Sequence, residues 1–206
     1  MRRVNSPAER YNLEHDDIFH MMTQIPGQDV MRSILRSLLS KNGKYIGPSR
    51  VFYSSNAEFG LGRCGPHKKN SRIDLMVEVR TSKMYAENRP GMVIALEVKT
   101  TDGDLLRERD NLRDKYIKSD QADSYWLLAS TDDIALKACC KYSDMPQVGV
   151  ACMSSARVLK VPERVGMSDR GRLRYVNEMN RRSMSSINDR FHDYHVRDNM
   201  WVELNI

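Results

Sequence analysis

The sequence of 206 residues has few of the features that mark secreted, membrane-spanning or zinc-stabilised proteins. It has four cysteines, and two of them, Cys139 and Cys140, are adjacent in a helical pattern, which makes them poor partners for long-range disulfides. The motif from Cys64 to His67 has no second pair at zinc-ligand spacing. We therefore expect reduced thiols and no cysteine–histidine metal site.

Long apolar runs are also missing. No stretch approaches the roughly 20 apolar residues that a membrane span needs, and no apolar segment follows the N-terminal arginines as it would in a secretory signal. Hydrophobic residues make up 40% of the chain and charged residues 29%, as in a globular protein. The sequence therefore predicts a cytoplasmic protein without a membrane partner.

Acidic residues are outnumbered, 27 against 33 lysines and arginines, which gives a net charge of +6 and favours a polyanionic partner. The excess is concentrated between Arg157 and Arg190, where nine basic residues face four acidic ones. A solvated helical face would have the same composition, so the charge alone does not decide between a nucleic-acid surface and a solvent surface.

The hydrophobic pattern divides the chain into three parts. We expect residues 1–27 to be irregular, 28–160 to form an α/β domain, and 161–206 to be a basic, partly helical C-terminal extension of it. Helical spacing begins at Asp29 and ends near Gly43. In the extension, residues 170–190 are expected to be helical and 200–206 to form an edge strand.

Within the domain, the expected order is helix, three strands, helix, strand, helix, strand. Residues 49–55 read as a strand and 56–70 as a glycine-rich loop or hairpin turn. Residues 71–80 alternate like a half-buried strand, and 92–100 read as a central strand that is apolar on both faces. Asp104 is expected to cap the next helix. Strands at 124–130 and 147–153 flank a helix at 131–142.

Charged residues end the central strand at Glu97 and Lys99. Because they lie two apart, their side chains leave the same face of the strand. Asp74 lies on the preceding strand, and antiparallel pairing would bring it to that face. Two carboxylates and the Val98 carbonyl would suit Mg²⁺, and a neighbouring ammonium can orient water or stabilise charge on phosphorus. This set is the minimum for metal-assisted phosphodiester hydrolysis.

The residues "ID" at 73–74 and "EVK" at 97–99 resemble the D…(D/E)xK signature of the PD-(D/E)xK nuclease superfamily. The stretch from Glu97 to Ser130 is most similar to its MmcB-like, DNA-repair-associated branch. The resemblance implies a restriction-endonuclease-like core with a mixed central sheet flanked by helices. It also implies a Mg²⁺- or Mn²⁺-dependent endonuclease or other nuclease in DNA repair, restriction or mobile-element processing, acting on DNA rather than RNA.

In that resemblance Asp74, Glu97 and Lys99 are catalytic, and Asp74, Glu97 and the Val98 carbonyl hold the metal. A further acid is usual, and both Asp29 and Glu58 remain candidates. Ile73 stands where the superfamily's signature has proline. Enzymes that cut both strands often pair two such sites, which leaves a homodimer open. The expected nucleic-acid contacts are made by Lys68, Lys69, Arg72 and Lys115.

Simpler interpretations remain open. Glu97 and Lys99 could form a structural ion pair, Asp74 and Glu78 could be solvent-facing acids, and the lysines at 68–69 could belong to a solvated loop. A second functional hypothesis keeps the fold without catalysis, as an inactive nucleic-acid-binding or accessory module. A third is a protein-interaction domain with no role at nucleic acid.

Overall fold

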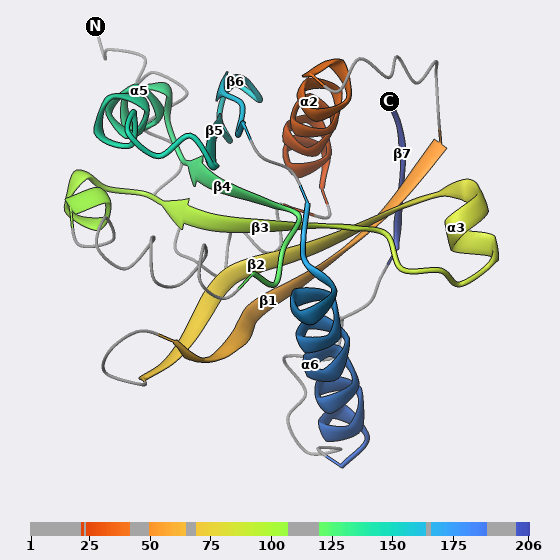
Figure 1. The fold of residues 1–206 in the computed structure, drawn as a ribbon. Helices are drawn as coiled ribbons and strands as arrows, with labels where there is room; N and C mark the ends of the chain where they lie inside the picture. Colours follow the sequence, from red (N-terminus) through yellow and green to blue (C-terminus); the bar gives the residue numbers. More distant parts are fainter. Residues whose placement is uncertain are drawn as a thin grey trace, which may run out of the picture.

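A computed structural model describes residues 22, 24–41, 50–64, 69–106, 120–163, 166–188 and 201–206, with the side chains of 25, 41, 55–64, 69–72 and 182–188 excepted. In this part of the chain, seven strands form one mixed sheet in the order β6-β5-β4-β3-β2-β1-β7 (Figure 1). The predicted α/β class, with a mixed sheet flanked by helices, is confirmed. The elements are α2 (Ile25–Lys41), β1 (Arg50–Cys64), β2 (Lys69–Thr81), α3 (Ser82–Ala86), β3 (Met92–Lys99), β4 (Ser124–Ala129), α5 (Asp132–Lys141), β5 (Val148–Cys152), β6 (Val158–Lys160), α6 (Asp169–Asn188) and β7 (Val202–Asn205).

The chain builds the sheet first as a meander and then by crossovers. β1, β2 and β3 pair antiparallel, whereas β4 pairs parallel with β3, and β5 parallel with β4. A parallel pair needs a long connection, usually a helix. Residues 102–106 begin a helix after β3, and α5 makes the crossover from β4 to β5. The carboxyl ends of β3, β4 and β5 therefore lie side by side at the same end of the sheet.

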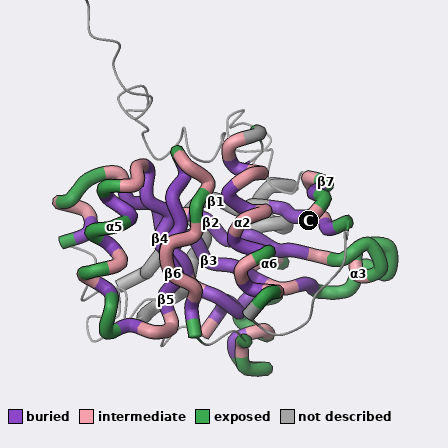
Figure 2. Tube along the Cα trace, turned by 90° about the horizontal axis from the view of Figure 1, so that it is seen from above, coloured by how far each residue is buried: buried purple, intermediate pink, exposed green. Residues whose placement is uncertain are grey.

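Helices cover both faces of the sheet. On one face, α2 packs over strand residues that include Leu75, Ile94 and Leu96. On the other, α5 and Tyr175 of α6 pack over Met76 and Ala95. β3 is therefore buried from Val93 onward (Figure 2), as predicted for a central strand covered on both sides.

Several predicted boundaries are wrong. α2 begins at Ile25, four residues before Asp29, so residues 25–27 are helical rather than irregular. Its second residue is Pro26, and proline is tolerated in the first turn because that N–H has no partner within the helix. The short elements α3 and β6 were not predicted.

Residues 56–70 were expected to form a loop or a hairpin turn, and the hairpin is confirmed, but its strands are much longer than expected. β1 runs through them to Cys64 and β2 already begins at Lys69, so the two strands form a long hairpin. Cross-strand hydrogen bonds outweigh the low strand propensity of glycine here. The glycines mark an irregularity in the ladder, since the register shifts between Gly60 and Gly62.

The C-terminal extension joins the same sheet. α6 forms over the predicted helical region, and β7 pairs with residues 50–53 of β1 as the predicted edge strand. Glu78 on β2 helps to hold α6 against the sheet. This residue was expected to face solvent. Glu78 is instead 5% exposed, and its carboxylate accepts hydrogen bonds from Arg80, the Gly91 N–H and the Tyr175 hydroxyl.

Candidate functional site

The candidate site lies at the carboxyl end of β3, where β2 and β3 separate. The last residue pair between these strands is Leu75 with Leu96. One step further along the same register, Asp74 comes opposite Glu97. Beyond this point, within the residues that the structure describes, β2 pairs with β1 only, so the backbone of β3 has no strand neighbour on that side.

The carboxylate of Asp74 takes the place of the missing strand. Its Oδ2 accepts a hydrogen bond from the backbone N–H of Val98, with a donor–acceptor distance of 2.8 Å. Val98 is 2% exposed, so its N–H needs a partner within the protein. The carboxylate of Asp74 is thereby held beside the residue that links Glu97 and Lys99.

Asp74 was expected to reach the face of Glu97 and Lys99 by regular alternation along β2. The structure is different in detail, because Ile73 packs in the cluster that contains Leu105, whereas Leu75 packs in the opposite one. The alternation therefore does not extend from Leu75 to Ile73. Asp74 lies at the point of change and contacts the backbone of β3.

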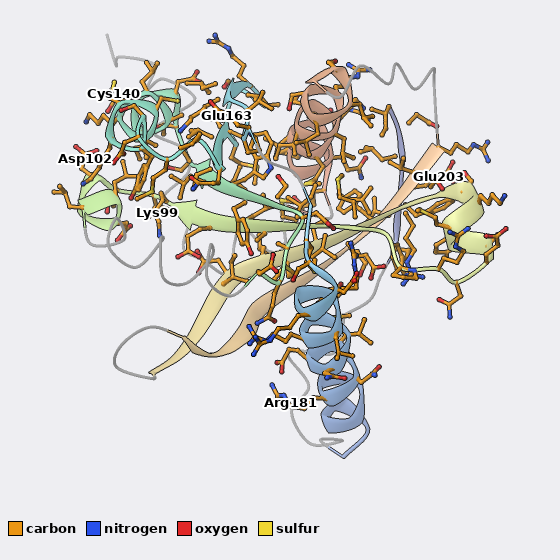
Figure 3. All side chains as sticks on the ribbon, viewed as in Figure 1. Lys99, Asp102, Cys140, Glu163, Arg181 and Glu203 are labelled. Atoms are coloured by element: carbon orange, nitrogen blue, oxygen red, sulfur yellow. The ribbon has the colours of Figure 1, made fainter. Side chains whose placement is uncertain are left out.

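Glu97 and Lys99 form a buried ion pair. The Lys99 Nζ lies 3.2 Å from the Glu97 Oε1, and the two side chains are only 5% and 6% exposed respectively. Removing two charges from water is costly unless they are paired and hydrogen-bonded. Asp74, the Val98 backbone, Glu97 and Lys99 are thus brought together, and Lys99 lies at the tip of β3 (Figure 3).

The polar residues after β3 form a helix cap. The Thr101 hydroxyl accepts a hydrogen bond from the Asp104 N–H at 3.3 Å and donates to the Asp104 carboxylate at 2.9 Å. Thr100 also donates to that carboxylate. Thr101 is therefore the capping residue, and the prediction that Asp104 caps this helix is wrong. The reciprocal pattern of a hydroxyl followed three residues later by an acid was readable in the sequence.

One ion-pair cluster ties this cap to α5. The Lys137 Nζ lies 2.8 Å from the Asp102 carboxylate and 2.9 Å from that of Asp133. The two acids raise the pKa of Lys137 to about 12. The contact links the segment after β3 to the helix after β4, and so braces the edge of the sheet that carries Lys99.

The two candidates for a further acid differ in position. Asp29 lies on α2, where it pairs with Arg32, and Arg32 donates to the Asn205 carbonyl on β7. β7 pairs with the start of β1, which is the opposite end of the sheet from Lys99. Asp29 therefore does not join the site. Glu58 follows Ala57, the partner of Leu75, so the β1–β2 register brings its backbone beside Asp74.

The four residues expected to contact nucleic acid lie wholly or partly outside the described part of the structure. Lys69 and Arg72 lie on the part of β2 that pairs only with β1, but their side chains are outside the described part of the structure. Lys68 and Lys115 lie outside the described residues altogether. Nucleic-acid binding by these four residues stays a prediction.

A second polar cluster, which sequence reasoning missed, lies at the opposite end of β3. Asp123 is 9% exposed and accepts hydrogen bonds from the Val93 N–H, the Met167 N–H and the Arg172 guanidinium. Arg172 also donates to the Gly91 carbonyl. These contacts anchor the start of α6 to the sheet. They join residues up to 81 positions apart, so no local pattern could reveal them.

The donor chemistry at the β3 end fits a hard divalent cation. Carboxylates are preferred ligands of Mg²⁺, which needs only one or two of them when waters complete its shell. Within the described ranges no group of three or more His, Cys, Asp or Glu side chains could hold a metal ion. A site made of two carboxylates and one backbone oxygen contains only two such side chains, so it does not count as a group of this kind.

No protein family and no curated protein matches this sequence. Among solved structures, the chain is similar to a protein of unknown function from Silicibacter pomeroyi. The two are 16% identical, the match covers 82% of this chain and 97% of the other, and the TM-score is 0.41. A likeness at this TM-score supports no conclusion about function. In the ranges that the structure describes, no helix combines the length and apolar character needed to cross a bilayer.

Proposed function

We propose that this protein is a divalent-metal-dependent nuclease of the PD-(D/E)xK type with a restriction-endonuclease-like core, hydrolysing phosphodiester bonds in DNA. The observation that carries the proposal is the hydrogen bond from Val98 to Asp74. It holds a second carboxylate beside the buried pair of Glu97 and Lys99, at the carboxyl edge of parallel strands, where ligand sites of α/β sheets commonly lie.

Each residue has a role that follows from its chemistry. Asp74, Glu97 and the Val98 carbonyl would hold Mg²⁺ or Mn²⁺, with Glu58 as a further acid. When bound, the ion polarises a phosphate oxygen and lowers the pKa of a coordinated water. The Lys99 ammonium orients the attacking water and stabilises negative charge developing on the phosphate. Because Lys99 is 4% exposed, water screens its charge less than at the surface.

The decisive experiment is a cleavage panel of single-stranded, duplex, branched and mismatched DNA and of RNA, each with Mg²⁺, Mn²⁺ or a chelator. We expect products from DNA only with metal, and none from the Lys99→Ala variant. The matched control is Lys83→Ala, which removes an exposed lysine of α3 that pairs with Glu87 just after this helix, at the far end of the sheet. Cleavage that survives both chelator and Lys99→Ala would overturn the proposal.

The second candidate function is a nucleic-acid-binding module without catalysis, which the basic composition of α6 favours. Its exposed arginines include Arg170, Arg174 and Arg181. Arg181 forms an ion pair with Glu178. Binding that weakens steeply with salt, without any metal-dependent product, would favour this module. Absence of salt-dependent binding would instead favour a protein-interaction domain.

We also propose the cytoplasm as the compartment and leave a homodimer as the assembly to test. Cys139, Cys140 and Cys152 are free thiols, and burial raises the pKa of the Cys139 thiol, which keeps it protonated and less reactive. Free thiols are typical of a reducing compartment. Sedimentation velocity with and without duplex DNA tests whether two chains assemble on the two strands.

A further inference from the structure

The end of the sheet opposite Lys99 carries a group of aromatic side chains. The rings of Phe52 on β1 and Tyr85 on α3 stack with their centroids 4.3 Å apart and an interplanar angle of 16°. The Trp201 ring, just before β7, meets the Tyr85 ring in a T-shaped contact at 5.4 Å. The Arg80 guanidinium on β2 lies 4.6 Å from the centre of the Trp201 ring. We call these three rings and the guanidinium the aromatic platform.

Hydrogen bonds beneath the aromatic platform hold its cation in place. The Arg80 Nε donates to the Glu78 carboxylate at 2.8 Å, and its Nη1 donates to the Asn88 side chain at 2.9 Å. Glu78 is buried and accepts two further hydrogen bonds. Arg80 therefore cannot leave the Trp201 ring without breaking both of its own bonds. A surface that is already ordered loses little conformational entropy when a ligand binds.

The Tyr85 ring stays exposed although it is stacked. Tyr85 is 41% exposed, and α3 buries none of its residues, so this helix adds nothing to the core while it carries a large ring over Phe52. A single exposed aromatic side chain is ordinary. A stacked pair beside a third ring and a fixed cation is instead a surface on which another planar group can stack.

The charges around the aromatic platform present positive groups to solvent. Arg50 lies two residues before Phe52, on the same face of β1, and its side chain is 70% exposed, against 46% for its partner Glu203. Arg89 is 58% exposed, against 43% for its partner Glu87. Exposed ion pairs of this kind contribute little stability, so a phosphate can replace the acid at small cost. Anionic ligands are therefore favoured beside the rings.

We propose that the aromatic platform binds unpaired nucleobases and so holds a single-stranded segment of nucleic acid at a second site, separate from the candidate active site. Bases that are not paired can stack on aromatic side chains while basic groups contact the phosphates. The bases of a duplex are already stacked on one another and do not offer this contact. The inference takes its partner class, nucleic acid, from the proposed function, but the binding needs neither metal nor cleavage.

The platform lies far from the residues proposed to carry the chemistry. Phe52 pairs with Arg80, and Arg80 is six residues from Asp74 on β2, about 20 Å at about 3.4 Å per residue. In Figure 1, α3 lies at the right of the sheet, whereas β3 ends at the left. A base stacked on Tyr85 is therefore too distant to contact Lys99. The platform contributes affinity for a single strand and takes no part in the chemical step.

The test is fluorescence anisotropy in chelator-containing buffer with a labelled single strand of about 12 thymidines, within the range of lengths bound by single-strand binding domains. The comparison probe is an abasic strand of equal length, which has the same phosphates but no bases. Tyr85→Ala removes the exposed ring and Tyr85→Phe keeps it. The matched control is Leu136→Ala, which removes an exposed apolar side chain from α5. Thermal unfolding confirms that all three variants are folded.

We expect the thymidine strand to bind at least about tenfold more tightly than the abasic strand, and Tyr85→Ala to lose about tenfold in affinity for it. Tyr85→Phe and Leu136→Ala should each lose less than about twofold. The thymidine strand should also quench tryptophan emission, through Trp201, because the second tryptophan, Trp126, is buried. Equal binding of the two probes, equal losses in Tyr85→Ala and Leu136→Ala, or no binding would overturn the inference.

Cleavage distinguishes the failure of this inference from failure of the proposed function. If the protein binds the thymidine strand through Tyr85 but cleaves nothing with Mg²⁺ or Mn²⁺, the platform stands and the nuclease proposal fails. If it cleaves DNA but binds the two probes equally, the platform fails and the nuclease stands. Lys99→Ala should abolish cleavage and leave strand binding unchanged. Conversion of a dimer to a monomer by Tyr85→Ala, with strand binding intact, would assign the ring to self-association and overturn the inference.

Discussion

Asp74 on β2 completes the hydrogen bonding of Val98 on β3 at the point where these strands part, with 2.8 Å between the carboxylate oxygen and the backbone nitrogen. The contact has two separable components. An oxygen atom that accepts the N–H bond has a structural role, whereas the negative charge is needed only to hold a cation.

The first prediction separates those components by comparing Asp74→Asn with Asp74→Ala. The asparagine amide oxygen can still accept the Val98 N–H, so we expect the free energy of unfolding to change by less than about 0.5 kcal/mol. Alanine leaves that buried N–H unsatisfied, at a cost of about 1–3 kcal/mol. Urea denaturation measures both.

Metal-dependent cleavage should be lost in both variants, because neither retains the charge of Asp74. Calorimetric titration with Mn²⁺ provides an independent reading of metal binding. Full activity in Asp74→Asn would show that Asp74 only satisfies the β3 backbone.

The second prediction concerns the buried pair of Glu97 and Lys99. Lys99→Met keeps the aliphatic length but removes the ammonium partner of the Glu97 carboxylate, whose side chain is 6% exposed. We expect a loss of about 3–5 kcal/mol in the free energy of unfolding. Adding Glu97→Gln removes the isolated charge and should recover part of that loss.

A double-mutant cycle by chemical denaturation measures the coupling between Glu97 and Lys99. Additive effects of the two substitutions would mean that the 3.2 Å contact contributes no coupling energy. The same variants should lack cleavage whatever their stability, since each removes a charge at the proposed site.

The third prediction is a pH dependence that arises at α6. Burial, together with the charge of Glu78 and its hydrogen bond, raises the pKa of Tyr175 far above the ordinary value of 10.0. Above pH 10 the unfolded chain loses this proton while the folded chain keeps it, so stability falls as pH rises. The stabilisation is fully present below pH 10.

Tyr175→Phe should therefore flatten the decline in unfolding free energy between pH 10 and 11, measured by urea denaturation at each pH. Tyr53 remains as a second buried tyrosine whose pKa is raised by burial, so some decline should persist. An unchanged slope in Tyr175→Phe would contradict the assigned contact with Glu78.

Much of the fold could be predicted because its signals are local. The apolar run before Glu97 is long enough to identify a buried central strand, and the strand–helix alternation after it predicts the crossovers. The convergence of Asp74 with Glu97 followed from a meander between neighbouring strands, which requires only one pairing assumption.

The errors lie where tertiary contacts override local pattern. Glu78 looks solvent-facing within an alternating strand, but its partners Gly91 and Tyr175 are 13 and 97 positions away. The extension of β1 to Cys64 depends on pairing with β2, against a glycine-rich composition. For Asp29, helical periodicity predicted that the residue lies on a helix, but it could not predict against which end of the sheet that residue lies.

The last prediction tests how α6 is attached. A Cβ atom at Gly171 would lie 1.6 Å from the Asp120 carbonyl oxygen, and Asp120 has a positive φ of 52°, which leaves its backbone little freedom to move. In an unconstrained helix, Gly→Ala stabilises by about 1 kcal/mol. Here we expect Gly171→Ala to destabilise by about 1–3 kcal/mol, because the overlap requires a backbone shift.

Asn177→Ala is the matched control, since it also raises helix propensity on α6 but at an exposed position. It should leave the free energy of unfolding unchanged or slightly higher. Limited proteolysis provides a second measurement, because displacement of α6 also strains the contacts of Arg172 with Asp123. If Gly171→Ala stabilises the protein and α6 stays resistant to protease, the close packing of α6 on Asp120 is wrong.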